Sequence, residues 1–172
     1  MIYLGLMMTL SVCLTLFLSG AAKVFDLRSS GRSAASIGIL PNSLGRLFGY
    51  VLPFAEIILA ALLLTDTQMR LALVAAALLF AAFITANAIV LVQGKDIACH
   101  CFGSLLRGTM GWGGLLHSVI MMICCTVGYL WPGFSVSDLL SDPGIDHMIM
   151  IGVPAVGIFL MGMISREILF YR

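Results

Sequence analysis

Long apolar runs alternate with short polar segments along this chain. Residues 1–22 and 71–94 carry no charged side chain, and a run of about 20 apolar residues is long enough to cross the hydrocarbon core of a bilayer. Three further runs are apolar with few interruptions. The pattern predicts five transmembrane helices, at residues 2–22, 47–65, 70–94, 112–131 and 147–165.

Features of three runs bear on this prediction. Trp112 and Trp131 bound the fourth run and would lie roughly 28 Å apart on a helix, which matches two interfacial aromatic belts. Pro154 interrupts the fifth run, which is the weakest of the five. The first run has no basic segment before it and no clear cleavage site, so we expect a retained helix and not a signal peptide.

Composition sets the protein class. The chain of 172 residues is 61% hydrophobic and 10% charged, and its mean hydropathy is +1.12. These values exclude an ordinary soluble domain, and the connections at residues 65–70 and 132–146 are too short to hold one. We therefore expect an all-α integral membrane protein, with a single transmembrane domain over residues 1–172.

The basic residues fall unevenly on the two sides of this five-span arrangement. One side carries eight of them and the other carries only Arg70, and such an excess marks the cytoplasmic side. The pattern predicts a periplasmic N-terminus and a cytoplasmic C-terminus. Because topology explains the basic residues, we expect lipid and no nucleic acid as a partner. The eight are Lys23, Arg28, Arg32, Arg46, Lys95, Arg107, Arg166 and Arg172.

Three polar residues interrupt the predicted spans. Glu56 lies in the second span, where an ionised carboxylate must be protonated, paired or turned into the bundle. Asn87 and His117, in the third and fourth spans, are its candidate partners. The three side chains either tie helices together or handle protons, and sequence alone leaves both interpretations open.

The densest chemistry lies in the segment Cys99-His100-Cys101-Phe102-Gly103, in a polar loop predicted at the cytoplasmic side. A disulfide between thiols one residue apart closes a small ring and is expected to be strained and labile, which suits exchange chemistry. Positive charge on His100, Lys95 and Arg107 favours the thiolate. Two unpaired interfacial thiols are the simpler alternative. The cluster offers at most three metal ligands, so we expect no closed zinc site.

The other cysteines lie within predicted spans. Cys13 and Cys124 each fall near the middle of the membrane, so they could form a second relay pair or serve as small apolar packing residues. Cys124 and Cys125 point about 100° apart on a helix and are not expected to bond to each other.

Four segments together resemble the methylamine utilisation protein MauE family, which is related to DoxX-like membrane proteins. The Cys-x-Cys-Phe-Gly segment is the most specific of them, and Leu-Pro-x-x-Glu is weak by itself. The segments are Ser19-Gly20-Ala21-Ala22-Lys23-Val24-Phe25-Asp26, Ser36-Ile37 with Leu40-Pro41, Leu52-Pro53-Phe54-Ala55-Glu56 and Cys99-His100-Cys101-Phe102-Gly103.

The resemblance implies a bacterial inner-membrane protein with a four-helix transmembrane core, to which the fifth C-terminal span is added. It also implies that Cys99 and Cys101 are the redox pair. Such proteins are associated with maturation of the disulfide-rich small subunit of methylamine dehydrogenase, together with a thioredoxin-like partner, MauD. That client acquires its disulfides in the periplasm, whereas the charge pattern predicts the Cys-His-Cys loop at the opposite face.

The leading hypothesis is therefore a membrane thiol–disulfide exchange protein, a candidate oxidoreductase in which Cys99, Cys101 and His100 carry the chemistry. A quinone is a candidate electron acceptor, although no sequence pattern identifies a pocket for it. Two alternatives stay open. One is a carrier of soft metals such as Cu, Hg or Zn, and the other is a non-catalytic membrane assembly factor.

Overall fold

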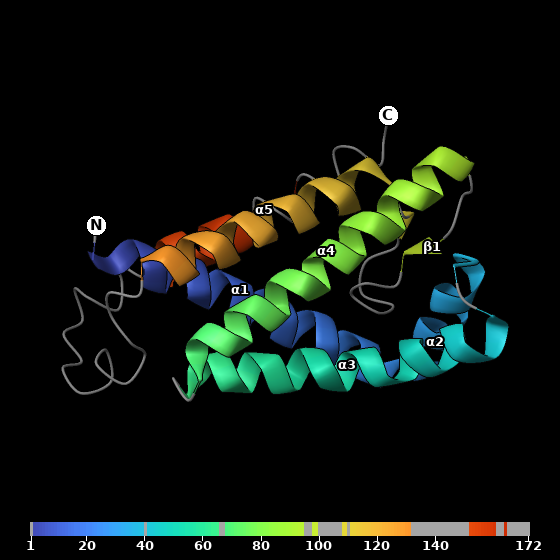
Figure 1. Ribbon diagram of the computed structural model, residues 1–172, viewed down its shortest axis with the longest axis horizontal. Coiled ribbons are helices and arrows are strands. Elements are labelled where there is room, and N and C mark those ends of the chain that lie inside the picture. The colour runs from blue at the N-terminus through green and yellow to red at the C-terminus, as the bar shows by residue number, and fades with distance from the viewer. Residues whose placement is uncertain are drawn as a thin grey trace.

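A computed structural model describes residues 2–39, 41–65, 68–94, 98–99, 108–109, 111–131, 152–160 and 164. Its main elements run along the chain in the order α1 (Ile2–Phe25), α2 (Leu27–Ser36), α3 (Asn42–Leu64), α4 (Met69–Gln93), β1 (Ala98–Cys99), β2 (Gly108–Thr109) and α5 (Trp112–Leu130) (Figure 1).

The four long helices form an up-and-down bundle. α1 packs against α3 and α5, and α4 packs against α5. α3 and α4 meet near the short connection between them and then diverge toward the end of the bundle that carries α2 and β1 (Figure 1). This divergence leaves a gap between two neighbouring spans, and α2 packs on α3 beside it.

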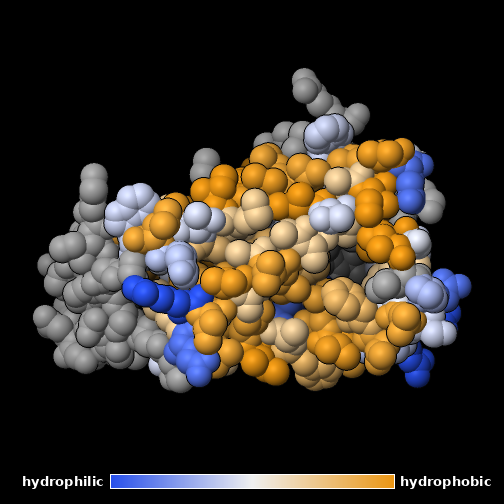
Figure 2. Space-filling model, viewed as in Figure 1, coloured by the Kyte–Doolittle hydropathy of each residue, from blue (hydrophilic) through white to orange (hydrophobic). Residues whose placement is uncertain are grey.

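Each long helix is suited to a bilayer. Within the described residues, four helices are long and apolar enough to cross a membrane: Leu4–Phe25, Asn42–Leu64, Met69–Gln93 and Trp112–Leu130. Large apolar side chains such as Phe54, Leu71 and Leu78 point outward, and the molecular surface between the ends is mostly hydrophobic (Figure 2). Such a surface is stable in lipid and not in water. The chain is a multi-pass membrane protein.

The bundle interior is built from medium-sized apolar side chains and several small polar ones. The main core cluster joins α1, α3, α4 and α5 through residues such as Leu16, Leu63, Leu73 and Met121. Close helix contacts depend on glycine at several points; for example, a Cβ atom at Gly128 of α5 would lie 2.7 Å from Oγ1 of Thr9 on α1. Small residues at helix contacts are typical of membrane bundles, because backbones can then approach closely.

Four of the five predicted spans coincide with helices, and the fifth is not shown. The second begins earlier than expected, because Pro41 precedes the first turn of α3 and its fixed φ suits the start of a helix. Of the predicted span 147–165, residues 152–160 and 164 are described and are helical. This segment packs on α1, where Ser11 Oγ donates to the Ala155 carbonyl oxygen at 3.0 Å.

α2 is a short amphipathic helix within the first connection. Asp26 caps its N-terminus by accepting a hydrogen bond from the Ser29 amide at 3.2 Å, which satisfies one free amide of the first turn. Its arginines, Arg28 and Arg32, are exposed, while Ser29 and Ser30 are buried against α3. The charges and buried serines place α2 at one end of the bundle, where lipid head groups meet water.

A short antiparallel strand pair joins the two ends of the connection between α4 and α5. Ala98 faces Thr109 and Cys99 faces Gly108 in its register. α4 ends at Gly94, whose φ of 59° is a left-handed conformation that glycine adopts without strain. The strand pair thus follows immediately on the end of a transmembrane helix.

Candidate functional site

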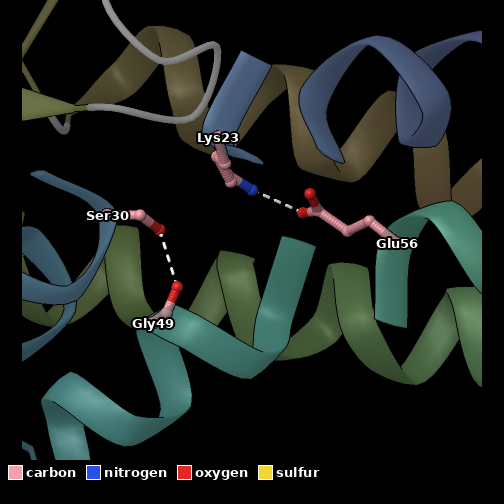
Figure 3. Close-up of polar contacts among 4 residues, drawn as sticks. All are labelled: Lys23, Ser30, Gly49 and Glu56. Atoms are coloured by element: carbon pink, nitrogen blue, oxygen red, sulfur yellow. Dashed lines mark hydrogen bonds and ion pairs between the residues drawn. The ribbon is translucent and has the colours of Figure 1, made fainter. Parts of the chain in front are cut away.

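A buried ion pair joins α1 to α3. Nζ of Lys23, in the last turn of α1, lies 2.5 Å from Oε1 of Glu56, near the middle of α3 (Figure 3). Only 4% of the Lys23 side chain and 0% of the Glu56 side chain are exposed. Nζ also lies 5.0 Å from the centroid of the Phe83 ring on α4, which is within cation–π range. A carboxylate that would be unstable alone in lipid therefore has a cation beside it.

This partner was missed from sequence. Lys23 was assigned to a cytoplasmic loop as one of the eight basic residues, whereas α1 continues to Phe25 and Lys23 is buried. The assignment was wrong because an apolar run was taken to end at its first charge. Gly20, one helical turn earlier on the same face, is the sequence signal that indicates a close helix contact here.

Gly20 is what allows the two charges to meet. A Cβ atom at this position would lie 2.9 Å from the Pro53 carbonyl oxygen and 3.2 Å from Cβ of Glu56. α1 and α3 therefore approach closely just before Lys23, and the long lysine side chain spans the remaining distance. Any larger residue at position 20 would push α3 away from α1 and weaken the ion pair.

A second polar contact holds α2 onto α3 beside the pair. Pro53 has no amide hydrogen, so the Gly49 carbonyl, four residues earlier, lacks its normal helical donor. The Ser30 hydroxyl of α2 donates to that carbonyl oxygen at 2.9 Å (Figure 3). In lipid, a freed backbone carbonyl must be satisfied by such a neighbour. The contact explains why the Leu-Pro-Phe-Ala-Glu segment of α3 and the serines of α2 lie together.

The approach of α2 to α3 depends on paired glycines. A Cβ atom at Gly49 would lie 2.7 Å from Cα of Gly31, and one at Gly45 would lie 2.8 Å from Cα of Ala35. Gly45 and Gly49 are four residues apart and so share one face of α3, the spacing of a small-xxx-small helix contact. Sequence reasoning did not use this spacing, although it was the signal that could have placed α2.

Behind the ion pair lies a small polar cavity of about 30 Å³. All four long helices line it, and its wall includes Glu56, Asn87 and His117. A cavity needs about 15 Å³ of such volume to hold a water molecule, so this one has room for roughly one. The three polar residues that sequence reasoning considered together thus lie around one space. The remaining lining residues are Thr15, Leu16, Ser19, Phe80, Phe83, Gly114 and Ser118.

The cavity wall is held by local hydrogen bonds. Nδ2 of Asn87 donates to the Phe83 carbonyl oxygen at 2.8 Å, and the Ser118 hydroxyl donates to the Gly114 carbonyl oxygen at 2.8 Å. Gly114 faces the asparagine so closely that a Cβ atom there would lie 2.5 Å from Asn87 Oδ1. α4 and α5 therefore meet at Asn87 only because position 114 is glycine.

The Cys-His-Cys segment begins in the strand pair. Cys99 is the second residue of β1, and its backbone pairs with that of Gly108. β1 lies at the end of the bundle where α4 ends, which is also the end that carries α2 (Figure 1). His100 and Cys101 lie outside the described residues, so their predicted roles stay predictions.

Comparison with known families identifies the chain. The family described as methylamine utilisation protein MauE matches residues 1–131. The chain belongs to the MauE family. No curated protein and no solved structure matches it.

The MauE match extends from the first described helix to the end of α5. It therefore includes the ion pair, the polar cavity and the strand pair in one unit. The family links the chain to methylamine utilisation and agrees with the multi-pass fold. Residues 132–172, including the expected fifth span, lie beyond the match.

Three cysteines of this MauE-family chain are free, buried thiols: Cys13, Cys124 and Cys125. All three belong to the main hydrophobic core, and Cys13 Sγ donates to the Ala60 carbonyl oxygen at 3.4 Å. This is the environment of packing residues, and the second relay stays a prediction. Among the described residues, no three His, Cys, Asp or Glu side chains gather in a metal-binding group.

Proposed function

We propose that this MauE-family protein is a membrane thiol–disulfide exchange protein that assists the maturation of a periplasmic client. Cys99 and Cys101 form the proposed redox pair, and His100 tunes their reactivity. The proposed partner is a thioredoxin-like protein of the MauD kind, and the proposed client is the small subunit of methylamine dehydrogenase. Membership of the methylamine utilisation family supports this client.

One observation carries the proposal: Cys99 is anchored by backbone pairing at the end of the helix bundle. Residues 98–99 and 108–109 form the base of the connection, directly after the Gly94 cap of α4 and before α5. A reactive group is positioned best when a rigid scaffold supports it. Cys13, Cys124 and Cys125, in contrast, are enclosed in the core, where a partner protein has no access.

In the exchange step, the bonds and electrons balance between the Cys99–Cys101 pair and its partner, and no third reactant is needed. A thiolate of the thioredoxin-like protein attacks the Cys99–Cys101 disulfide, and a mixed disulfide forms as one cysteine leaves as thiolate. The second thiolate of the partner then breaks the mixed disulfide. The partner leaves as a disulfide able to oxidise the client, and Cys99 and Cys101 remain as a dithiol that has gained two electrons.

The polar cavity supports a role in proton handling. Reoxidation of the dithiol releases two protons, and titratable groups near the reaction are useful for carrying them. Glu56 and His117 are the titratable groups that line the cavity, and Asn87 would orient them or a water molecule between them. The ion pair with Lys23 gives Glu56 a second function as an interhelical tie.

The proposed location is the bacterial inner membrane, with the N-terminus in the periplasm. The exposed arginines of α2 and Arg46 lie at the same end as β1, which favours the cytoplasmic side for that end. Burial of Lys23 removes one charge from the eight basic residues counted for this side, and Lys95, Arg107, Arg166 and Arg172 lie outside the described residues. In this orientation the Cys99–Cys101 pair and the periplasmic client lie on opposite sides of the membrane, so the exchange between the pair and the partner passes through a relay across the bundle, for which Cys13 and Cys124 are the candidates.

Trapping of the mixed disulfide tests the proposal. Cys99→Ser and Cys101→Ser are expressed separately with a thioredoxin-like partner whose own disulfide is intact, so that the remaining cysteine attacks this disulfide and cannot be displaced, and covalent complexes are sought on non-reducing gels. One single variant should accumulate the complex, and the double variant should form none and should leave the client reduced. Cys125→Ala is the matched control, because it also removes one thiol but from the closed core.

Two results would count against the exchange function. Normal client oxidation in the double variant would show that the protein acts as a non-catalytic assembly factor. A mixed disulfide that persists in the double variant but disappears in Cys125→Ala would assign the chemistry to the core thiols instead.

A further inference from the structure

A second and larger cavity opens between α3 and α4 where these helices diverge. Its volume is about 330 Å³, within the usual range for small-molecule sites of about 300–1,000 Å³. Figure 2 shows the hollow in the apolar face of the molecule. The lining residues are Lys23, Ser30, Ser33, Ala34, Ile37, Ile39, Gly45, Phe48, Leu52, Leu79, Ala82, Phe83, Thr85 and Ala86.

The surroundings of the opening show where a ligand would come from. Phe48 and Ile39 line the cavity and are about half exposed, at 47% and 52%. Both lie on the outer surface of a membrane-embedded bundle, so the opening faces acyl chains or the region just below the head groups. A molecule that enters must be dissolved in the bilayer.

The cavity has one charged donor among its described lining residues, the ammonium of Lys23. Ser30 and Thr85 donate their hydroxyl hydrogens to the backbone carbonyls of Gly49 and Ala81. The Lys23 ammonium has three N–H bonds. Among the described residues, it donates a hydrogen bond to Glu56. The polar end of the cavity is thus a hydrogen-bond donor within an otherwise apolar wall.

These properties select the chemical class of the ligand. Glu56 already neutralises Lys23, so an anionic phosphate would face a carboxylate and would find few other donors for its oxygens. A neutral carbonyl needs only a single donor and an apolar surface for its ring. We propose that this cavity binds a lipid-soluble quinone, with one quinone carbonyl accepting a hydrogen bond from Lys23 and the ring lying between α3 and α4.

The proposal extends the proposed function, on which its redox step rests. Two S–H bonds of the Cys99–Cys101 dithiol break and one S–S bond forms, while the quinone takes up the two electrons and two protons and becomes a quinol. The exchange pair is then ready for another partner. The exchange cycle requires a two-electron acceptor after each turnover, and the proposed quinone would fill that role.

The ion pair lies between the two cavities. Lys23 lines the quinone cavity, Glu56 lines the small polar cavity, and Phe83 lines both. A proton that leaves Lys23 for the quinone oxygen must be replaced from outside the pair, and the small polar cavity that Glu56 shares with His117 offers a route for it. The geometry therefore gives the pair a positioning role in proton delivery.

Binding is tested on the full-length protein in detergent with decylubiquinone, a short-chain quinone, by equilibrium dialysis. Ala82→Trp places an indole at a lining position on α4 and should weaken binding at least tenfold. Ala61→Trp is the matched control, since Ala61 is also exposed on a transmembrane helix but does not line the cavity. Equal effects of the two variants would overturn the site.

The lysine is tested with a charge-neutral double variant, Lys23→Met with Glu56→Gln, which avoids leaving one buried charge alone. It should remain folded by size-exclusion chromatography and bind decylubiquinone about tenfold more weakly, because the carbonyl loses its donor. Unchanged affinity in this folded variant would overturn the role of Lys23. Displacement of the quinone by phosphatidylglycerol at equal concentration would show a lipid site and overturn the ligand class.

Failure of this proposal can be separated from failure of the exchange function. Cys99→Ser with Cys101→Ser should bind decylubiquinone normally but form no mixed disulfide. Ala82→Trp should form the mixed disulfide once but should not regenerate the Cys99–Cys101 disulfide with added quinone. Regeneration at the normal rate in Ala82→Trp, with Ala61→Trp as control, would overturn quinone as the acceptor in this cavity while leaving thiol exchange intact.

Discussion

Ser30 donates its hydroxyl to the carbonyl oxygen of Gly49, the carbonyl from which Pro53 removes the normal helical donor. The proline and the serine are 23 positions apart in the sequence, and the contact joins α2 to α3. It converts a local defect of a transmembrane helix into an interhelical bond. α2 is thereby held beside the segment that carries Glu56.

We predict that Ser30→Ala destabilises the protein by about 1 kcal/mol, because the Gly49 carbonyl loses its donor in an apolar setting. In a Pro53→Ala background the helix regains its own donor, so the cost of Ser30→Ala should fall markedly. A double-mutant cycle by reversible SDS unfolding measures this coupling. Ser36→Ala is the control, since Ser36 bonds the Ser33 carbonyl oxygen at an exposed site within α2. Equal costs of Ser30→Ala in both backgrounds would contradict the role of Pro53.

The Lys23–Glu56 pair should behave as one unit. Lys23→Met or Glu56→Gln alone should cost about 3–5 kcal/mol if the remaining charge stays buried, and the double variant should recover most of that loss. The measurement is the free energy of unfolding of all four proteins in one detergent. Arg28→Met, which removes an exposed cation from α2, should change stability little. Additive losses in the double variant would show that the two charges do not compensate each other.

Close packing at Asn87 should make position 114 intolerant of a methyl group. Gly114→Ala places a Cβ atom 2.5 Å from Asn87 Oδ1, so the helices must separate, at a cost of about 1–3 kcal/mol. Gly111→Ala is the matched control, because the nearest atom to its Cβ, on Leu91, is 3.9 Å away. Thermal unfolding in detergent compares the two. A Gly114→Ala protein as stable as Gly111→Ala would show that Asn87 can turn aside freely.

The charge pattern predicts that the α2 end of the bundle faces the cytoplasm. In a background with Cys99→Ser and Cys101→Ser, an impermeant maleimide should label Arg32→Cys in inside-out vesicles and Thr65→Cys in spheroplasts. These positions are exposed near opposite ends of the bundle, and the native cysteines that remain are buried. The reverse labelling pattern would invert the topology and place the β1 end in the periplasm with the proposed client.

Much of the fold follows from local hydrophobicity. The four spans could be predicted because about 20 consecutive apolar residues have few stable alternatives to a membrane helix. The fifth was predicted from a weaker run around Pro154, and residues 152–160 and 164 of it are described as helical. α2 was not predicted because its ten residues depend on a cap at Asp26 and on packing against Gly45 and Gly49.

The candidate site, like the fold, is partly determined by the sequence and partly by the tertiary structure. Sequence determined that two thiols, Cys99 and Cys101, lie one residue apart in a polar connection and that Glu56, Asn87 and His117 are polar groups within spans, because residue type and hydropathy are properties of the chain itself. Only the tertiary structure decided that Lys23 is the cation beside Glu56, and that α3 and α4 diverge around an apolar cavity at Lys23. Those relationships depend on how closely helices approach, which Gly20 permits and which no single run of residues reveals.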